Sequence, residues 1–411
     1  MPDRRDNCPY LSNRDQADAD GDGFGDACSC EPAGAACVDG MAGDFPCENV
    51  DLLGRLPNAQ FNGALNSDVW GWTDPESGRE IAILGVDAGT GFVDLSNPSC
   101  PRPVGFLPAN GRRSSWRDME THDGVLFVSS EAQDHDVQVF DLRRLPTSGT
   151  ELPVFEPDTL IRRIGSAHTV SIATEAGILA VNGGAQCPGM QLVDIGDPLD
   201  PRLGACFDEV DYVHDAQCVT YHGPDPDHEG SVICLAGTGF GATIAIVDVT
   251  DVDAPRLLAD FDYGGEDARF AHQGWLTDDH ATFLFGDELD ELEVGNDTRT
   301  FLVDVTDLDA PRVIRRHQWD TTAIDHQIYL ANGWLYMASY TAGVRIADPS
   351  RAAEGVLTEV AWFDVIPTDD SRTFFGAWSV YPWFDSGIVV VSNITSGLEV
   401  LRPTLPSDAP E

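Results

Sequence analysis

Val247-Asp248-Val249-Thr250-Asp251 is one copy of a short pattern that recurs through this chain of 411 residues. In each close copy, a Val-Asp pair is followed by an apolar residue, a small residue and then Asp or Asn. Successive copies lie about 50 residues apart, which is the period of a four-stranded propeller blade. Seven copies therefore predict seven blades. The other copies, close or loose, begin at Val93, Phe140, Val193, Val303, Ala347 and Leu401.

Short runs rich in β-branched residues accompany each copy of the pattern. Around Val247, one run ends in the pattern itself at 243–247 and another follows at 256–260. The Asp or Asn that ends the pattern favours a tight turn between these two runs. Two more runs precede them, at 216–220 and 232–236. Each unit thus predicts four strands, which we letter A to D from the channel outward.

The last unit stops after three strands, at 378–381, 388–391 and 398–401. We expect its missing D strand at the start of the chain, because Val50 to Pro57 resembles the D strand of the first unit, Pro103 to Pro108. Such a strand closes the ring and removes its free sheet edges. The predicted fold is all-β: residues 49–403 form one seven-bladed propeller closed by an N-terminal strand, preceded by a small irregular module.

Acidic residues number 69 against 24 basic ones, every basic residue is arginine, and the formal net charge is -45. Nucleic acids and anionic membranes both bind proteins through a positive surface, so this charge argues against either as a partner. We interpret the charge first as a solvated acidic surface and second as a capacity to bind cations.

The ten cysteines include no Cys-x-x-Cys pair, which favours disulfides and an oxidising compartment. Strand geometry predicts two of the pairs. Cys218 and Cys234 lie on strands A and B of the fourth unit, equidistant from the turn between them. Cys187 and Cys206 are placed symmetrically about the turn between strands C and D of the third unit.

No stretch approaches the ~18 apolar residues of a membrane span, so we expect no direct membrane insertion. The residues after Met1 are Pro-Asp-Arg-Arg rather than the apolar core of a signal peptide. Together with the cysteines, this predicts a mature or trimmed exported protein, extracellular or on a cell surface.

Carboxylates on alternate positions mark the N-terminal segment, at Asp18, Asp20 and Asp22, and are followed by a glycine at Gly23. This spacing can bring several oxygens onto one hard cation, as in an EF-hand loop. The flanking helices and the glutamate at position twelve of an EF-hand are missing. The alternative interpretation is an acidic leader whose spacing is fortuitous.

The same segment resembles a thrombospondin type 3 repeat over about 23 residues. The resemblance rests on Asp6-Asn7-Cys8-Pro9, on Asn13-Arg14-Asp15-Gln16 and on the run from Asp18 to Cys28. It implies calcium as a cofactor, and a disulfide between Cys8 and Cys28. Of the remaining cysteines, Cys37 and Cys47 are the preferred pair, which leaves Cys30 with Cys100. The implied calcium ligands are Asp18, Asp20, Asp22, the Phe24 carbonyl and Asp26, with Asp6, Asn13 and Asp15 for a second ion.

Histidines recur at the start of strand A in four adjacent units, where the strand lines the channel. They are His168, His214, His272 and His326. Strand B runs antiparallel to A, so its end returns to the same face and brings carboxylates with it. Imidazoles and carboxylates together are the ligand types of a transition-metal site. The candidate further ligands or bases are Glu131, Glu288, Asp118 and Asp325.

Two alternatives to a hub metal remain open. Polar side chains in a wet channel often only hydrogen-bond one another or water, and metal-free acid-base chemistry is also possible. We expect the acidic run 287–291 to be a solvated loop, and Trp70, Trp72, Trp378 and Trp383 to pack in the core rather than line a cleft. The sequence holds no Gly-x-Ser-x-Gly elbow, phosphate loop or His-Glu-x-x-His motif, so it identifies no catalytic residue.

Residues 37–403 also resemble the bacterial choice-of-anchor B family, whose members contain LVIVD-type propeller repeats. The resemblance implies an exported, surface-associated propeller, but the acidic tail at 404–411 carries none of the family's C-terminal sorting signals. The family supplies no biochemical activity to carry over. The motifs include Asp68-Val69-Trp70-Gly71-Trp72, His214-Asp215-Ala216-Gln217-Cys218, His272-Gln273-Gly274-Trp275, Asp287-Glu288-Leu289-Asp290-Glu291 and Trp378-Ser379-Val380-Tyr381-Pro382.

The predicted organisation is a calcium-binding repeat at 1–30, a Cys-rich linker at 31–48, the propeller at 49–403 and the acidic tail. Two functions follow from it. The first is an exported, calcium-binding scaffold for adhesion to an extracellular protein or glycan. The second is a metal-binding protein or metalloenzyme, a hydrolase or an oxidoreductase, with its site in the hub. Fold alone does not decide between them.

Overall fold

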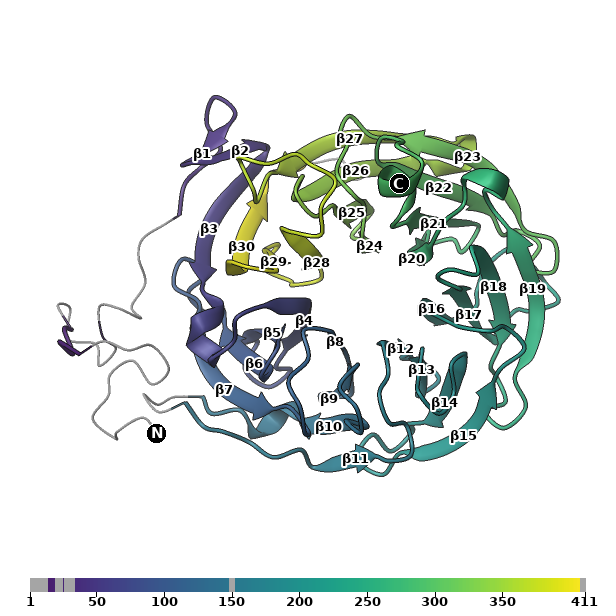
Figure 1. Ribbon diagram of the computed structural model, residues 1–411, viewed down its shortest axis with the longest axis horizontal. Helices are drawn as coiled ribbons and strands as arrows, with labels where there is room; N and C mark the ends of the chain where they lie inside the picture. Colours follow the sequence, from purple (N-terminus) through teal and green to yellow (C-terminus); the bar gives the residue numbers. More distant parts are fainter. Residues whose placement is uncertain (1–13, 19–24, 26–33, 148–151, 407–411) are drawn as a thin grey trace.

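Seven sheets surround a central channel in the computed structural model (Figure 1). The structure describes residues 14–18, 25, 34–147 and 152–406. The chain visits the blades in sequence order around the ring, and the strands of each blade run from the channel to the rim. The predicted all-β, seven-bladed propeller is confirmed.

Blades 1 to 5 are each built from four consecutive strands. Blade 1 holds β4 (Asn66–Thr73), β5 (Glu80–Val86), β6 (Gly89–Asp94) and β7 (Arg102–Pro108). Blade 2 holds β8 (Arg117–His122), β9 (Val125–Ser130), β10 (Val137–Asp141) and β11 (Thr159–Ile161), and blade 3 holds β12 (Thr169–Ala173), β13 (Ile178–Asn182), β14 (Met190–Asp194) and β15 (Arg202–Phe207). Blade 4 holds β16 (Asp215–Thr220), β17 (Val232–Gly237), β18 (Thr243–Asp248) and β19 (Arg256–Asp262), and blade 5 holds β20 (Ala271–Leu276), β21 (Thr282–Asp287), β22 (Arg299–Asp304) and β23 (Arg312–Gln318).

Blade 7 combines the two ends of the propeller. Its strands are β28 (Ala377–Tyr381), β29 (Val389–Asn393), β30 (Gly397–Pro403) and, on the outside, the N-terminal β3 (Val50–Leu56). β3 runs antiparallel to β30, with Leu52 opposite Leu401. The predicted closure by an N-terminal strand is therefore confirmed.

Blade 6 is wider than the others. To β24 (Ile328–Ala331), β25 (Trp334–Ala338), β26 (Val344–Arg351) and β27 (Val356–Phe363) it adds a hairpin of β2 (Phe45–Glu48) and β1 (Met41–Ala42). Cys47 pairs with Phe363 in the sheet and forms a disulfide with Cys37. The segment 41–48, which we expected to be a linker, is thus part of the outer edge of this blade.

The recurring Asp residues form the turns that the sequence predicts. Asp248 ends β18, and its Oδ1 accepts the backbone N–H of Thr250 at 3.0 Å. Asp251 then accepts the N–H of Asp253, also at 3.0 Å. The same two hydrogen bonds occur at the copies that begin with Val93, Val193 and Val303. Each pattern therefore makes an Asx turn from strand C to strand D.

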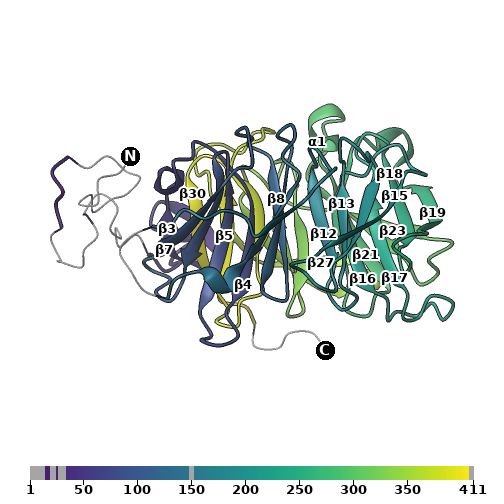
Figure 2. The same cartoon turned by 90° about the horizontal axis from the view of Figure 1, so that it is seen from below.

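Apolar residues pack between the blades rather than around one centre. Every residue of β5 and of β17 is buried, because neighbouring sheets cover both faces of these strands. Between blades 4 and 5, Phe283, Phe285 and Phe301 are fully buried and pack on one another. This packing holds the sheets upright around the channel (Figure 2).

In the part of the chain that the structure describes, helical structure is confined to single turns. They are α1 (Asp290–Glu293) and the 3-10 turns η1 (Asn58–Phe61), η2 (Leu142–Arg144), η3 (Gly265–Asp267) and η4 (Ala352–Glu354). α1 projects from one face of the ring (Figure 2). Among the described residues, no helix has the length and apolar character needed to cross a membrane.

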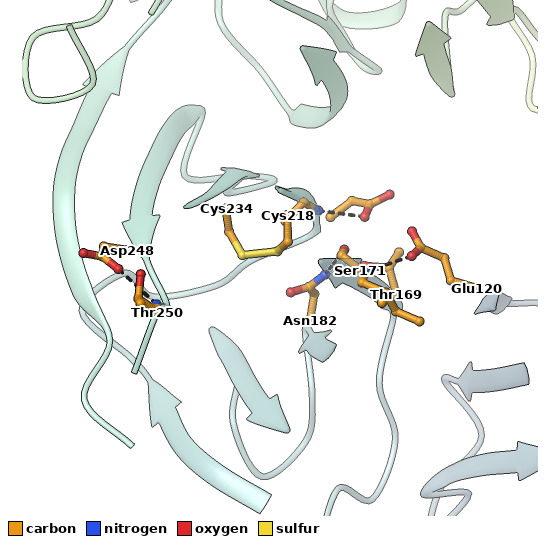
Figure 3. The surroundings of a disulfide bond; sticks show 11 residues. Glu120, Thr169, Ser171, Asn182, Cys218, Cys234, Asp248 and Thr250 are labelled. Carbon is orange, nitrogen blue, oxygen red and sulfur yellow. Dashed lines mark hydrogen bonds between the residues drawn. A yellow bond between two sulfur atoms is a disulfide. The ribbon is translucent and has the colours of Figure 1, made fainter. Parts of the chain in front are cut away.

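The disulfides follow the predicted strand geometry. Cys218 and Cys234 are directly opposite on β16 and β17 and are bonded to each other (Figure 3). Cys187 and Cys206 are bonded across the outer part of blade 3, and Cys37 to Cys47 on the edge of blade 6. Cys100 is also disulfide-bonded. Cys8, Cys28 and Cys30 lie outside the described residues, so their pairings stay predictions.

Replacing both Cys218 and Cys234 by Ala should lower the free energy of unfolding by about 3 kcal/mol, because the crosslink restricts the unfolded chain between positions 16 residues apart. Urea denaturation measures the change, and peptide mapping without reductant identifies the pair. A free thiol at either position in the oxidised protein would contradict the assignment.

Candidate metal centre in the central channel

Four histidine rings form a row at one end of the channel. His272 lies in β20, and His168, His214 and His326 precede β12, β16 and β24. The ring centroids of neighbouring histidines are 4.2, 4.5 and 4.2 Å apart along the row. The A strands of adjacent blades begin at the same height, so the predicted gathering of imidazoles on one face is present in the structure.

Glu288 completes this group from the end of strand B of blade 5. Its Oε2 is 3.7 Å from Nε2 of His272, and its Oε1 is 3.7 Å from Nε2 of His326. The hydroxyl of Tyr340 donates to Oε1 at 2.6 Å and fixes the carboxylate. Ligand atoms of His214, His272 and Glu288 all lie within 4.8 Å of one another.

The outer two histidines of the row have hydrogen-bond partners at Nδ1, whereas Nδ1 of the inner two has none among the described residues. Nδ1 of His168 contacts Oε1 of Glu131 at 2.6 Å, and Nδ1 of His326 donates to the carbonyl of Trp378. Nδ1 of His214 and of His272 is buried, and no described residue bonds to it. A buried nitrogen without a partner is costly unless a water or an ion supplies one.

Burial shifts the pKa of three of the histidines and of Glu288. It lowers the pKa of His214 and of His272 well below the usual value, and that of His326 to about 3. It raises the pKa of Glu288 to about 7, against the opposing hydrogen bond from Tyr340. At neutral pH, His214, His272 and His326 are therefore neutral imidazoles, which is the form that binds metal ions.

The other predicted ligands do not join this group. Glu131 is 41% exposed at its side chain and contacts only His168. Asp118 lines the channel below the histidines. The carboxylate of Asp325 is buried and lies instead against the backbone of Gly286. The position of residue 325 near the start of strand A predicts that it lies near the hub. Packing between blades 5 and 6, however, determines the direction of its side chain.

A layer of acids lies beneath the histidines. Asp68 and Asp118 border the same hollow as the histidine row, and Asp215 directly follows His214. Burial raises the pKa of Asp68 and of Asp215 to about 7, and that of Asp118 well above the usual value. Neighbouring acids add to the shifts of Asp68 and Asp118. Asp68 and Asp215 were not selected as site residues from the sequence, although their positions at the start of strand A indicated the channel.

The histidines and the acids line a small hollow in the channel. Trp116 and Trp378 border it on the outer side, and Arg117 lies at its wall. Arg117 is held away from the acids, because its Nε donates to the carbonyl of Val86 and its Nη1 contacts Nε2 of His135. Burial and Arg117 lower the pKa of His135 to about 4.

The acidic run 287–291 is not a solvated loop, so this expectation was wrong. Asp287 is 1% exposed and accepts the hydroxyl of Tyr263 and the N–H groups of Arg269 and Phe270. Asp290 pairs with Arg299. Glu291 is fully buried, and burial raises its pKa to about 12. The run is buried because its partners come from distant loops, which local charge composition does not reveal.

The tryptophans divide between core and cavity. Trp72 is 7% exposed and packs in the core, as expected. Trp378 borders the histidine hollow, whereas Trp70 and Trp383 line a second hollow. That second hollow lies at the opposite end of the channel, because Trp70 and Trp275 are near the ends of β4 and β20 rather than their starts.

Most of the predicted calcium module lies outside the described residues. This holds for Asp6, Asn13, Asp20, Asp22, Phe24 and Asp26. Asp15 is exposed and Asp18 is half-buried. Calcium binding by this segment stays a prediction.

Another group with metal-ligand chemistry joins blades 4 and 5. Nε2 of His228 contacts Oδ2 of Asp309 at 3.1 Å, and Asp225 accepts the N–H groups of Leu308 and Asp227. Both oxygens of Asp225 are thus used by the backbone. We interpret this group as a strut between the two loops.

Gly286→Ala should lower the free energy of unfolding by about 1–3 kcal/mol, because the added Cβ would lie 1.7 Å from Oδ2 of Asp325. In an Asp325→Ala background the same change should cost much less, since the clash is gone. Denaturation of all four proteins gives the coupling energy. Additive losses would contradict the placement of Asp325.

Comparisons with known proteins support the fold and identify neither a family nor an activity. No family model matches the chain, and no curated protein matches it. Among solved structures, it is similar to the Cps50 (Swd1) β-propeller domain of Myceliophteria thermophila, with a TM-score of 0.51, 12% identity, and 79% of this chain and 93% of that chain covered. It is also similar to the computationally designed Ika8 protein, with a TM-score of 0.50, 10% identity, and 86% and 93% covered. At these identities the likeness shows a β-propeller, and the family resemblances stay predictions.

Proposed function

We propose that this chain is an exported β-propeller whose channel binds one divalent transition-metal ion through His214, His272 and Glu288. The observation that carries the proposal is the convergence of one ligand atom from each of these three residues, all within 4.8 Å of one another. Two imidazoles and one carboxylate form a donor set that zinc and related ions prefer.

The spacing of the donors supports an ion rather than a direct contact. At 3.7 Å, Nε2 of His272 and Oε2 of Glu288 are too far apart for a hydrogen bond. Two ligands on a tetrahedral ion with bonds of about 2.1 Å lie roughly 3.4 Å apart. A small movement of either side chain therefore suffices for both to bind one ion.

The surroundings orient the donors and leave room beside them. Tyr340 holds the carboxylate of Glu288, in the way that outer hydrogen bonds orient metal ligands. The small hollow on the channel side offers room for a water at a fourth position. A water bound there would be activated for hydrolysis, which makes a metal-dependent hydrolase the enzymatic form of this proposal.

Three disulfides support the exported setting, because such bonds form and persist in oxidising compartments. The acidity of the chain supports a cation as the ligand of the channel rather than an anion.

The double variant His214→Ala and His272→Ala should lose stoichiometric metal, with little change in the melting point of the metal-free protein. The wild type should hold about one zinc, manganese or iron per chain after incubation and dialysis. Tyr340→Phe should weaken binding by about 10–100-fold, because it frees the Glu288 carboxylate. Elemental mass spectrometry measures the stoichiometry.

His317→Ala is the matched control, because His317 lies on the outer strand β23 away from the channel. It should leave the stoichiometry unchanged. His228→Ala separately tests the group at Asp225 and Asp309. Wild-type protein that holds no transition metal after incubation would reduce the histidine row to hydrogen-bonding struts.

A second candidate function is a calcium-stabilised binding scaffold. It is favoured by the alternating carboxylates from Asp18 to Asp26 and by their resemblance to a thrombospondin type 3 repeat. In this proposal the propeller is a rigid platform that presents its faces to an extracellular protein or glycan. The two candidates are compatible, since the calcium residues are not those of the channel.

Chelating calcium should increase proteolysis of segment 6–28 while the propeller stays folded, because closely spaced carboxylates repel one another without a divalent ion. Asp20→Ala or Asp22→Ala should have the same effect in the presence of calcium. Limited proteolysis and calorimetry measure it. Equal cleavage with and without chelator would refute the module.

A further inference from the structure

The mouth of the channel opposite the histidines is lined by aromatic rings. Trp383 contacts Trp70, Trp275, Tyr329 and Tyr381, with ring centroids 5.1 to 5.5 Å apart. All of these rings except Tyr329 are half-buried, so their faces or edges remain accessible. They come from blades 1, 5, 6 and 7 and fill one side of the mouth.

The other side of the mouth is a hollow with an empty volume of about 860 Å³. Four of the aromatic residues, Trp70, Trp275, Tyr381 and Trp383, form one wall. Glu120, Thr121, Ile172, Thr174 and Gln217 to Val219, from blades 2 to 4, form the facing wall. The residues that line this hollow include no arginine and no histidine.

Glu120 is the unusual member of the facing wall. Its Oε2 accepts the backbone N–H of Ile172 on the next blade at 2.8 Å (Figure 3). In blades 4 and 5 the same kind of link to the next inner strand is made by neutral side chains: Gln217 accepts the N–H of Leu276, and Gln273 accepts that of Ile328. A glutamine therefore satisfies this structural role, and the carboxyl group of Glu120 brings an ionisable group that the link does not need.

No described cation pairs with this carboxyl group. The charged groups that act on Glu120 are the acids Asp215 and Asp68. Burial, with the charge of Asp215, raises the pKa of Glu120 well above the usual value. A carboxylate in such a place is costly unless a cation lies close to it. A cation close to Glu120 would favour its ionised form. The hollow thus combines a carboxyl group without a described cationic partner and a wall of aromatic rings.

We propose that this aromatic mouth binds a small quaternary ammonium ion, held by the faces of Trp70, Trp275 and Trp383 and by the carboxylate of Glu120. The electron-rich face of an aromatic ring attracts a cation, and a methylated ammonium ion also fits an apolar wall. Charge complementarity thus selects the ligand. The proposal is independent of the metal ion at the other end of the channel.

A neutral sugar fits the site less well. It would need free hydrogen-bonding groups beside the rings, and two of those nearby are already engaged. Nε1 of Trp70 donates to Oγ1 of Thr121 at 3.3 Å, and Oε1 of Gln217 accepts the N–H of Leu276. What the wall still offers is chiefly charge and aromatic surface.

Titration of the full chain with choline chloride, against sodium chloride as the salt control, tests the proposal by calorimetry and tryptophan fluorescence. Saturable binding of one choline is expected. The uncharged isostere 3,3-dimethylbutan-1-ol should bind at least roughly tenfold more weakly, because it lacks the charge. Equal binding of the two compounds would overturn the proposal, as would the absence of choline binding.

Two variants locate the site. Glu120→Gln should weaken choline binding by at least roughly tenfold while the protein folds normally, because the glutamine keeps the link to Ile172. Trp383→Leu should weaken it by roughly tenfold. Trp116→Ala is the matched control, since Trp116 borders the hollow at the histidine end, and it should bind choline like the wild type. Choline binding unaffected by Glu120→Gln and Trp383→Leu would overturn the assignment.

Two further experiments ask where the quaternary ammonium group comes from and whether the ligand is a sugar instead. Sedimentation with phosphatidylcholine vesicles distinguishes a lipid headgroup from a free solute. Binding to either one supports the proposal, because both contain a quaternary ammonium group. Chitotetraose replaces choline in a parallel titration. If the sugar changes the tryptophan fluorescence and choline does not, the mouth is a carbohydrate site and the proposal is wrong.

Discussion

The inner strands of seven sheets meet around one axis, and this convergence forces residues at equal heights on neighbouring strands into contact. At the height where the A strands begin, it brings four imidazoles to centroid distances of 4.2 to 4.5 Å. One residue further in, it brings acids so close together that Asp68 and Asp215 add to the raised pKa of Asp118. The channel therefore acts as a set of layers, and each layer takes its chemistry from a single strand position repeated around the ring.

The convergence depends on a closed ring, and closure depends on both ends of the propeller sharing blade 7. β3 pairs with the outer edge of β30 as the fourth strand of blade 7, so that edge of β30 is not left free. Side-chain links between inner strands then hold the blades at a fixed height. Gln217 and Gln273 make such links between blades 4, 5 and 6, and Glu120 makes one between blades 2 and 3. A fixed height is what allows side chains from different blades to form one site.

Repetition made the fold predictable from the sequence. The Asp pattern gave the number of blades, the strand order and the turn type, and the symmetric placement of Cys218 and Cys234 gave their pairing. It also placed the four histidines on one face. Repetition does not determine where a side chain points once its strand is placed. Asp325 was expected in the channel and lies against Gly286, because packing between two blades decides its direction.

Non-repeated contacts were the least predictable part of the structure. The run 287–291 reads as a solvated loop, yet its Asp287 is enclosed by a loop 17 to 24 residues earlier in the chain. The aromatic mouth was missed for a similar reason. Its rings come from blades 1, 5, 6 and 7, so no local pattern links Trp70 to Trp383. Only the ring geometry places these residues beside one another.

The acidic residues have different structural roles in different parts of the molecule, and composition alone does not distinguish these roles. Many Asp residues accept backbone N–H groups in the turns between strands, as Asp194 and Asp248 do. The hydrogen-bond partners of these carboxylates are in the same turn. Others pair with arginines on the next strand, as Asp304 does with Arg312. The acids of the channel differ from both kinds, because their described neighbours are mostly other acids, neutral histidines or aromatic rings. A cation near either mouth would offset the cost of burying them. The two ends supply different ligands for it: imidazole nitrogens, which suit a metal ion, and aromatic faces, which suit an organic one.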